Sequence, residues 1–192
     1  IVVGVKGIAE WSVRQMRPDA VLIGDAEDIP NILQKVKDLS QKEEVPRTRS
    51  GFIVSMYSNK GGTGKTTAAI ALAMMLAQGN ISTVLCDFDV GGSDIAEFFN
   101  IKPKKNLETL DADLTVKISR NLFVFSGVYE RYNFRDTEFL KLARTIAGMY
   151  NVVVIDTPPA PWEKTYLHPV FADSDIVYAI VDQSKFSIHE TE

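Results

Sequence analysis

The chain has 192 residues, of which 45% are hydrophobic and 24% are charged, and its formal net charge is −4 at pH 7. This composition is ordinary for a globular protein with a sizeable core, and the acidic balance argues against tight nonspecific nucleic-acid binding by the whole surface. No apolar run approaches the roughly 20 residues of a membrane-spanning helix. The single cysteine, Cys86, lies in a predicted strand, so we expect a buried apolar residue in a reducing, cytoplasmic setting.

The first 50 residues predict an αβ segment followed by a linker. Residues 1–4 and 20–23 have the pattern of strands, residues 7–16 that of a helix, and a second helix begins near Pro30. Residues 41–50 are polar, charged and interrupted by Pro46, which is typical of a linker. We therefore expect a partial αβ segment over 1–40, a linker over 41–50 and a second domain from residue 51.

The second domain begins with a strand, a glycine-rich loop and a helix. Strand 52–57 precedes the sequence SNKGGTGKTT at 58–67, and a helical pattern runs from 65 to 78. Such a loop brings its backbone close to phosphates, and the positive end of the helix points to the same place. Lys65 would then reach the β- and γ-phosphates, and the Thr66 hydroxyl would coordinate Mg²⁺. The expected nucleotide-binding set is Asn59, Lys60, Gly61, Gly62, Thr63, Gly64, Lys65, Thr66 and Thr67.

Carboxylates follow two later strands. Strand 82–87 ends in the sequence DFD with Asp87 and Asp89, whose side chains share one face if the strand stays regular. The alternative is that these two acids form a turn ahead of the next glycines. Strand 151–156 contains four consecutive β-branched residues, typical of a central parallel strand, and ends at Asp156. Because ligands of open α/β sheets bind outside the carboxyl ends of strands, these acids and the glycine loop should converge.

The remaining elements complete the predicted fold. Strand 121–126, helix 136–149 and strand 176–181 follow from their apolar patterns. Alternating strands and helices predict a doubly wound, mostly parallel α/β sheet over residues 51–192.

The loop sequence KGGTGKTT resembles the deviant Walker A box of the ParA/MinD superfamily of P-loop ATPases. The ordinary P-loop pattern has its first glycine where this chain has Asn59, and a second lysine, Lys60, stands next to it. The resemblance implies that Lys60 reaches across a dimer interface to the phosphates bound by the partner subunit. The alternative is an ordinary solvated loop lysine.

The resemblance also implies roles for the remaining candidate residues. Asp87 and Asp156 would hold Mg²⁺ together with Thr66, and Asp89 would orient the attacking water. Residues 157–160 resemble the second switch of the family. The expected activity is a slow, partner-stimulated ATPase that uses ATP and Mg²⁺ and forms an ATP-dependent homodimer. Its catalytic residues would be Lys60, Lys65 and Asp89.

Residues 17–23 resemble the approach to the phosphoacceptor strand of a receiver domain, with Gly24 at the position of the phosphorylated aspartate. The alternative is a plain αβ extension of the ATPase. A degenerate receiver joined to such an ATPase resembles the TadZ/CpaE group, which marks the cell pole for pilus assembly. This implies protein partners in a polar or assembly machinery and a cytoplasmic location that is polar or membrane-associated through them.

Other members of the superfamily leave three alternatives open: a chromosome- or plasmid-partition ATPase, a division-site ATPase, and a nucleotide-dependent scaffold with negligible turnover. In the family, the adenine-contacting segment and any membrane-binding helix follow the strand at 176–181, and we expect them beyond residue 192. The preference for ATP over GTP therefore follows from the resemblance alone, and membrane and DNA binding stay unassigned.

Overall fold

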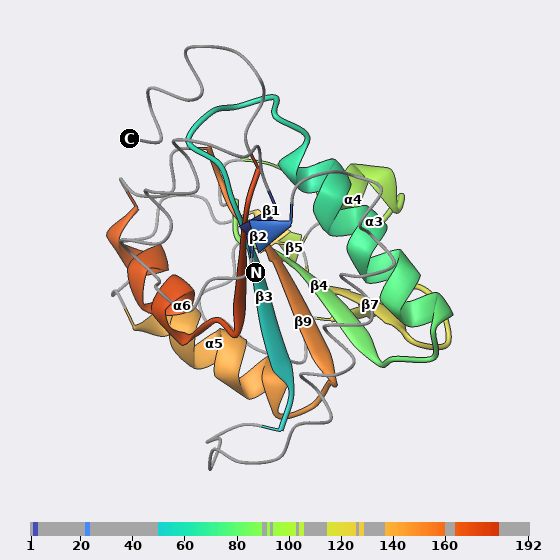
Figure 1. The fold of residues 1–192 in the computed structure, drawn as a ribbon. Coiled ribbons are helices and arrows are strands. Elements are labelled where there is room, and N and C mark those ends of the chain that lie inside the picture. The colour runs from blue at the N-terminus through green and yellow to red at the C-terminus, as the bar shows by residue number, and fades with distance from the viewer. Residues whose placement is uncertain are drawn as a thin grey trace.

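The computed structural model describes residues 2–3, 22–23, 50–89, 92, 94–102, 104–105, 115–125, 127–128, 137–159 and 164–180. Most of these residues belong to one six-stranded sheet with helices on both faces (Figure 1). Within this part of the chain, no helix is long and apolar enough to cross a membrane.

The sheet is parallel except at one edge. In spatial order its strands are β10 (Ile176–Ala179), β3 (Phe52–Tyr57), β9 (Val152–Asp156), β4 (Thr83–Asp87), β7 (Leu122–Phe125) and β6 (Val116–Lys117). All neighbouring strands pair in parallel except β6, which runs antiparallel to β7. The predicted mostly parallel, doubly wound α/β fold is confirmed, and the short antiparallel edge strand is an addition that the sequence pattern did not indicate.

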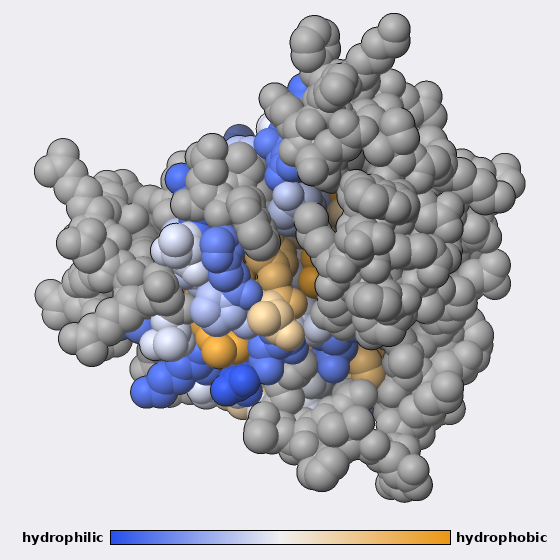
Figure 2. Space-filling view, turned by 60° about the vertical axis from the view of Figure 1, so that its left-hand side comes forward, coloured by the Kyte–Doolittle hydropathy of each residue, from blue (hydrophilic) through white to orange (hydrophobic). Residues whose placement is uncertain are grey.

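Helices cover the two faces of the sheet (Figure 1). On one face lie α3 (Lys65–Gln78) and α4 (Asp94–Phe98). On the other lie α5 (Glu138–Ala147), the 3₁₀ turn η4 (Thr165–Leu167) and α6 (His168–Asp173). Figure 2, in which the side bearing α5 and α6 comes forward, shows mostly hydrophilic described side chains with small apolar areas between them.

Alternation along the central strands divides the core into two clusters. Val54, Leu85 and Val154 pack with α3, whereas Ile53 and Val84 pack with α5. Successive side chains of a strand point to opposite faces, so a strand that is buried on both sides is apolar at every position. This explains why strands 52–57 and 151–156 are almost continuously apolar; the buried exception, Ser55, is hydrogen-bonded to the Ser174 hydroxyl.

The connections of β3 and β9 position the functional site. The chain leaves β3 into α3 on one face of the sheet, whereas after β9 it continues into η4 and α6 on the other face. Connections that diverge from two neighbouring parallel strands leave a crevice at their carboxyl ends, where α/β proteins bind ligands. The glycine loop after Tyr57 and the carboxylate of Asp156 lie at this crevice.

Several boundaries differ from the predicted ones by one to two residues. The strand expected over 121–126 is Leu122–Phe125, the helix expected over 136–149 is Glu138–Ala147, and the strand expected over 176–181 is Ile176–Ala179. Propensity and periodicity fade at the ends of elements, where caps and turns decide the backbone conformation. The helix predicted over 65–78 has these bounds in the structure, with Gly79 after its last turn.

Short strands lie outside the main sheet. β1 (Val2–Val3) and β2 (Leu22–Ile23) pair in parallel and fall within the two strand segments predicted for the first 40 residues. β5 (Lys104–Lys105) pairs in parallel with β8 (Gly127–Val128). The two helices predicted before residue 41, Gly24 and nearly all of the 41–50 linker lie outside the described residues, so the receiver-like assignment and the domain boundaries stay predictions.

Candidate functional site

The loop after β3 is held in shape by the buried hydroxyl of Ser58. Ser58 Oγ donates to the Lys60 carbonyl oxygen at 3.1 Å and accepts from the Lys60 backbone N–H at 3.3 Å. It also accepts a hydrogen bond from Thr63 Oγ1 at 2.9 Å. Tyr57 adds a hydrogen bond from its hydroxyl to the side-chain oxygen of Asn59. The loop therefore has a defined path of its own, and Asn59, which replaces the usual glycine, takes part in fixing it.

Two glycines have backbone angles that other residues avoid. Gly62 has φ 77° and Gly64 has φ 86° with ψ 15°, both in the left-handed region. Gly64 directly precedes the first residue of α3, so its conformation turns the loop into the helix. Residues other than glycine are strained at such backbone angles. Together with Ser58, these residues turn the loop back toward the N-terminus of α3.

Lys65 and Thr66, the first two residues of α3, converge on Asp156. Lys65 Nζ lies 3.4 Å from Asp156 Oδ1, with side-chain exposures of 9% and 3%. Thr66 Oγ1 donates to Asp156 Oδ2 at 2.6 Å. The structure thus joins two adjacent predicted site residues to a third that follows them by 91 and 90 positions.

Burial raises the pKa of the Asp156 carboxyl above its ordinary value. The charge of Lys65 and the hydrogen bonds from Thr66 and Lys65 act in the opposite direction, and the charge of Asp89 raises the pKa further. A carboxylate in this position is stabilised by any further positive charge that reaches it. The electrostatics therefore favour binding of a cation next to Asp156.

The D-x-D segment begins at the last residue of β4, which ends at Asp87 as the predicted range 82–87 does. Asp87, only 2% exposed, is the last residue of β4 and pairs in register with Asp156. The chain then leaves the strand: the Phe88 N–H donates to the Asp156 carbonyl oxygen at 2.9 Å, and the Asp89 N–H donates to Asp87 Oδ1 at 3.1 Å. The condition under which Asp87 and Asp89 would share one face, a regular strand through both residues, is therefore not met, because β4 ends at Asp87.

Asp89 nevertheless lies close to the other acids. It is partly buried, and its charge acts on the carboxyl of Asp156. Burial, with a smaller contribution from the charge of Asp89, raises the pKa of Tyr166 to about 12. The charge of Asp89 thus acts both on the Asp156 carboxylate and on Tyr166 of the 3₁₀ turn.

The predicted second switch begins with a structural contact. Thr157 is fully buried and its hydroxyl donates to the Met56 carbonyl oxygen at 2.6 Å, which ties the ends of β9 and β3 together. Pro159 is exposed and lies beside Gly61, at 4.0 Å from the place of an added Cβ atom. The rest of this segment, from Ala160, lies outside the described residues.

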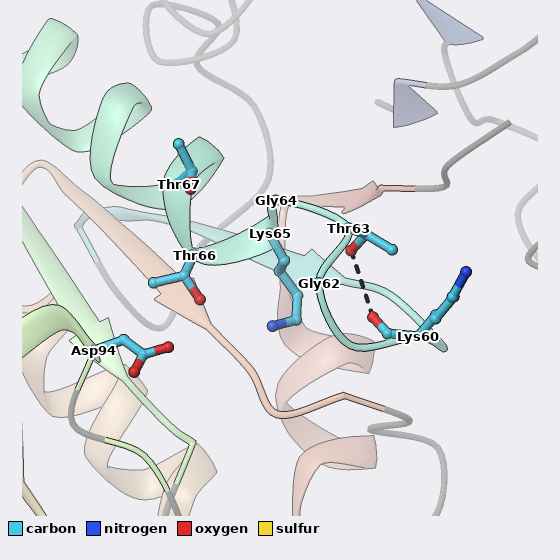
Figure 3. A pocket seen from close by; sticks show the side chains of 8 residues that line it. All are labelled: Lys60, Gly62, Thr63, Gly64, Lys65, Thr66, Thr67 and Asp94. Atoms are coloured by element: carbon cyan, nitrogen blue, oxygen red, sulfur yellow. Dashed lines mark hydrogen bonds between the residues drawn. The ribbon is translucent and has the colours of Figure 1, made fainter.

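The glycine loop, the first turn of α3 and the first residue of α4 line a pocket of about 270 Å³ (Figure 3). Figure 3 shows the Lys65 side chain extending into it beside Thr66, whereas the Lys60 side chain points away from Lys65. A hydrogen bond of 3.5 Å from Thr63 Oγ1 to the Lys60 carbonyl oxygen closes the part of the loop between Lys60 and Thr63. The residues that line the pocket are Lys60, Gly62, Thr63, Gly64, Lys65, Thr66, Thr67 and Asp94.

Asp94 was not among the predicted site residues. It is the first residue of α4 and follows Asp89 by five positions. A short helix of five residues has no recognisable periodicity, and only the path of the chain after Asp89 brings Asp94 to the pocket. An acidic residue soon after the D-x-D segment was the only available signal, and it is a weak one.

The donor set fits a magnesium ion. Thr66 Oγ1 lies at the pocket and is hydrogen-bonded to Asp156 Oδ2, so two hard oxygen atoms are adjacent there, and Asp87 is the register neighbour of Asp156. Mg²⁺ is usually held by one or two carboxylates together with waters and substrate phosphates. Among the described residues, no three His, Cys, Asp or Glu side chains form a complete metal site. The arrangement thus suits an ion that arrives with a phosphate ligand better than one held by the protein alone.

A parallel sheet, a loop with left-handed glycines, and a buried lysine and threonine facing a carboxylate on the neighbouring strand define a P-loop NTPase fold. The family model described as "ParA: NUBPL iron-transfer P-loop NTPase" matches residues 50–129.

Relatives and a solved structure agree with this fold. An uncharacterised ATP-binding protein of Methanocaldococcus jannaschii is 28% identical over 145 residues, which are 70% of this chain and 54% of that protein. The septum site-determining protein MinD of Helicobacter pylori is 25% identical over 153 residues, 73% of this chain and 56% of that protein. The crystal structure of a plasmid partition protein from Borrelia burgdorferi matches with a TM-score of 0.60 at 25% identity, covering 73% of this chain and 70% of that one.

These findings confirm the resemblance to the ParA/MinD superfamily: residues 50–129 match the ParA family model, and the sheet around them has the P-loop NTPase fold. The chain spans about half the length of the curated relatives it matches.

Proposed function

We propose that this chain binds Mg²⁺–ATP in the pocket at the N-terminus of α3, hydrolyses it slowly and dimerises in the ATP-bound state. The observation that carries the proposal is the convergence of Lys65 and Thr66 on Asp156, at 3.4 and 2.6 Å. The ATP-binding protein of M. jannaschii among the relatives supports the choice of ATP.

Residues of the loop, of α3 and of the strand ends share the tasks in this proposal. Lys65 contacts the β- and γ-phosphates, to which the backbone N–H groups of the glycine loop also donate. Thr66 and Asp156, with Asp87 beside them, hold the Mg²⁺ ion, which when bound neutralises part of the phosphate charge. Asp89, just outside the end of β4, orients the attacking water.

Lys60 is assigned to the dimer. Its carbonyl oxygen is fixed inside the loop by Ser58 and Thr63, whereas its side chain points away from Lys65 (Figure 3). A lysine whose side chain points away from the phosphate site of its own subunit is suitably directed to reach the nucleotide bound by a facing subunit. Two triphosphates that face each other need such compensating charge in a partly desolvated interface.

The cellular task is the positioning of other machinery, and we favour the assembly of pili or secretion systems in the manner of the TadZ/CpaE group. The parallel pair β1 and β2, which falls within the predicted αβ segment, supports this choice. The protein would then be cytoplasmic and reach a pole or membrane through protein partners. A second candidate, partition of DNA or placement of the division site, is favoured by the similarity to a plasmid partition protein and to MinD.

The experiment is a titration of the full-length protein with a labelled ATP analogue in Mg²⁺, followed by measurement of phosphate release with and without candidate partners. Saturable binding with slow release that a partner accelerates is the expected result. Binding without any turnover would contradict the ATPase and favour a nucleotide-dependent scaffold. Absence of binding would contradict the proposal as a whole.

A further inference from the structure

Asp94 is the one acidic residue among the eight that line the pocket. It comes from α4, and Figure 3 shows its carboxylate at the pocket opposite the loop, on the side of Thr66. The other lining residues contribute two lysines, three threonine hydroxyls and glycine backbone, all suited to phosphate oxygens. A carboxylate in the same lining repels a triphosphate that carries no metal ion.

Asp94 differs from the two buried acids of the site. Asp87 and Asp156 end strands of the sheet, are each 2% exposed, and are engaged by backbone or side-chain donors. Asp94 is exposed, lies on a separate helix, and among the residues that the structure describes it has no ion pair. Its charge is therefore directed at whatever enters the pocket.

We propose that Asp94 makes the pocket selective for the magnesium complex of the nucleotide over the metal-free nucleotide. A carboxylate facing a phosphate chain repels it, whereas a divalent cation between them turns the same carboxylate into an acceptor for the waters of that cation. The inference rests on the proposed binding of Mg²⁺–ATP and adds a residue that senses whether the ion is present.

A structural role for Asp94 is the competing explanation, and the chain offers a control for it. Asp94 and Glu97 both lie in the first turn of α4, where acidic side chains stabilise a helix. Glu97 is also exposed, but it does not line the pocket. An effect that comes from helix stability or from the general charge of α4 would appear equally in Asp94→Asn and Glu97→Gln.

The test measures the affinity of the full-length protein for a labelled ATP analogue in excess Mg²⁺ and in a chelator. We expect Asp94→Asn to lower the ratio of the two affinities on the order of fivefold, the effect of one unit charge a few ångströms away in a solvated site. Most of the change should be tighter metal-free binding. Glu97→Gln should keep the ratio of the unmodified protein.

An unchanged ratio in Asp94→Asn, or an equal change in Glu97→Gln, would overturn the inference while leaving the proposed function intact. Absence of binding by the unmodified protein even in Mg²⁺ would overturn the proposed function, and the role of Asp94 with it. The two failures are thus distinguishable in one set of titrations.

Discussion

The two ends of the central strands differ in how their polar groups are satisfied. At the amino ends, backbone pairs largely with backbone: the N–H groups of Gly51, Phe52 and Thr83 donate to the carbonyl oxygens of Ala147, Asn151 and Asn121, each at 2.8 Å. One carboxylate, that of Asp175, accepts from the Ile53 N–H there at 2.8 Å. At the carboxyl ends, side chains such as Lys65 and Asp156 are buried with charges of both signs. The amino ends complete the fold, whereas the carboxyl ends hold charges that the fold alone does not need.

Burial of ionised groups opposes folding unless they are paired and hydrogen-bonded. At the carboxyl ends the Lys65–Asp156 distance of 3.4 Å leaves the pair looser than a short ion pair, and burial still raises the pKa of Asp156. Such an arrangement is improved by a ligand that brings phosphate oxygens to Lys65 and a cation to Asp156. Substitutions at the two ends should therefore separate nucleotide binding from stability.

The largest expected effect is that of Lys65→Ala on nucleotide binding. The substitution removes the buried cation of the pocket and should weaken binding of Mg²⁺–ATP by about 2–5 kcal/mol. Titration with a labelled ATP analogue measures this, and Lys141→Ala, an exposed lysine of α5, is the control that should bind normally. Equal affinity of Lys65→Ala and the unmodified protein would refute the assigned phosphate site.

Asp89→Ala should separate hydrolysis from binding. Because Asp89 lies beyond the end of β4 and outside the pocket lining, its removal leaves the phosphate contacts in place. Loss of a water-positioning group lowers the rate on the order of a hundredfold or more. The variant should accumulate in the ATP-bound form in a single-turnover experiment, and a rate like that of the unmodified protein would show that Asp89 has another role.

Gly51→Ala tests the amino ends. An added Cβ atom would lie 2.1 Å from the Tyr150 carbonyl oxygen and 2.5 Å from that of Ala147, both backbone atoms. We expect a loss of about 2–3 kcal/mol in the free energy of unfolding, from denaturant titration, with unchanged ATP affinity of the folded molecules. Gly79→Ala, where the nearest atom would lie at 3.3 Å, is the matched control and should change stability by less than about 1 kcal/mol. Similar losses in both variants would contradict this account of the close approach.

The smallest expected effect concerns Cys86 and alkaline pH. Burial, with a smaller contribution from Asp87, raises the pKa of its thiol above the ordinary value. A raised folded-state pKa contributes stability below the unfolded pKa of about 8.5, and this contribution is lost as the pH rises above it, by about 0.8 kcal/mol at pH 9. Unfolding free energies at pH 7 and 9 should therefore fall less in Cys86→Ala than in the unmodified protein. Equal decreases of the unfolding free energy in Cys86→Ala and in the unmodified protein would show that the Cys86 thiol does not contribute to the pH dependence.

The sequence was sufficient for the parts of the fold that local pattern determines. Largely apolar runs identified β3 and β9, because both faces of these strands are buried. The glycine loop located the start of α3 at Lys65, because the turn into the helix needs glycine at left-handed backbone angles. The convergence of Lys65, Thr66 and Asp156 also followed, since parallel strands present their carboxyl ends at one edge.

What the sequence did not determine depends on where the chain goes between elements. The path of the chain beyond β4 depends on hydrogen bonds of the Phe88 N–H to the Asp156 carbonyl oxygen and of the Asp89 N–H to the Asp87 carboxylate. The place of Asp94 at the pocket depends on the turn before a short helix, and the antiparallel strand β6 has only two residues. Such features depend on tertiary contacts, which cannot be read from the hydrophobic periodicity or the intrinsic propensities of a segment.

The central claim, that the carboxyl ends of the strands form a nucleotide-dependent switch between two subunits, is tested most directly through Lys60. The measurement is the dimer fraction of the full-length protein, by light scattering or sedimentation, with and without a nonhydrolysable ATP analogue. The account predicts that the analogue raises the dimer fraction of the unmodified protein, while Lys60→Ala binds the analogue but stays monomeric. Equal dimer fractions for Lys60→Ala and the unmodified protein, or no response of the unmodified protein to bound analogue, would contradict it.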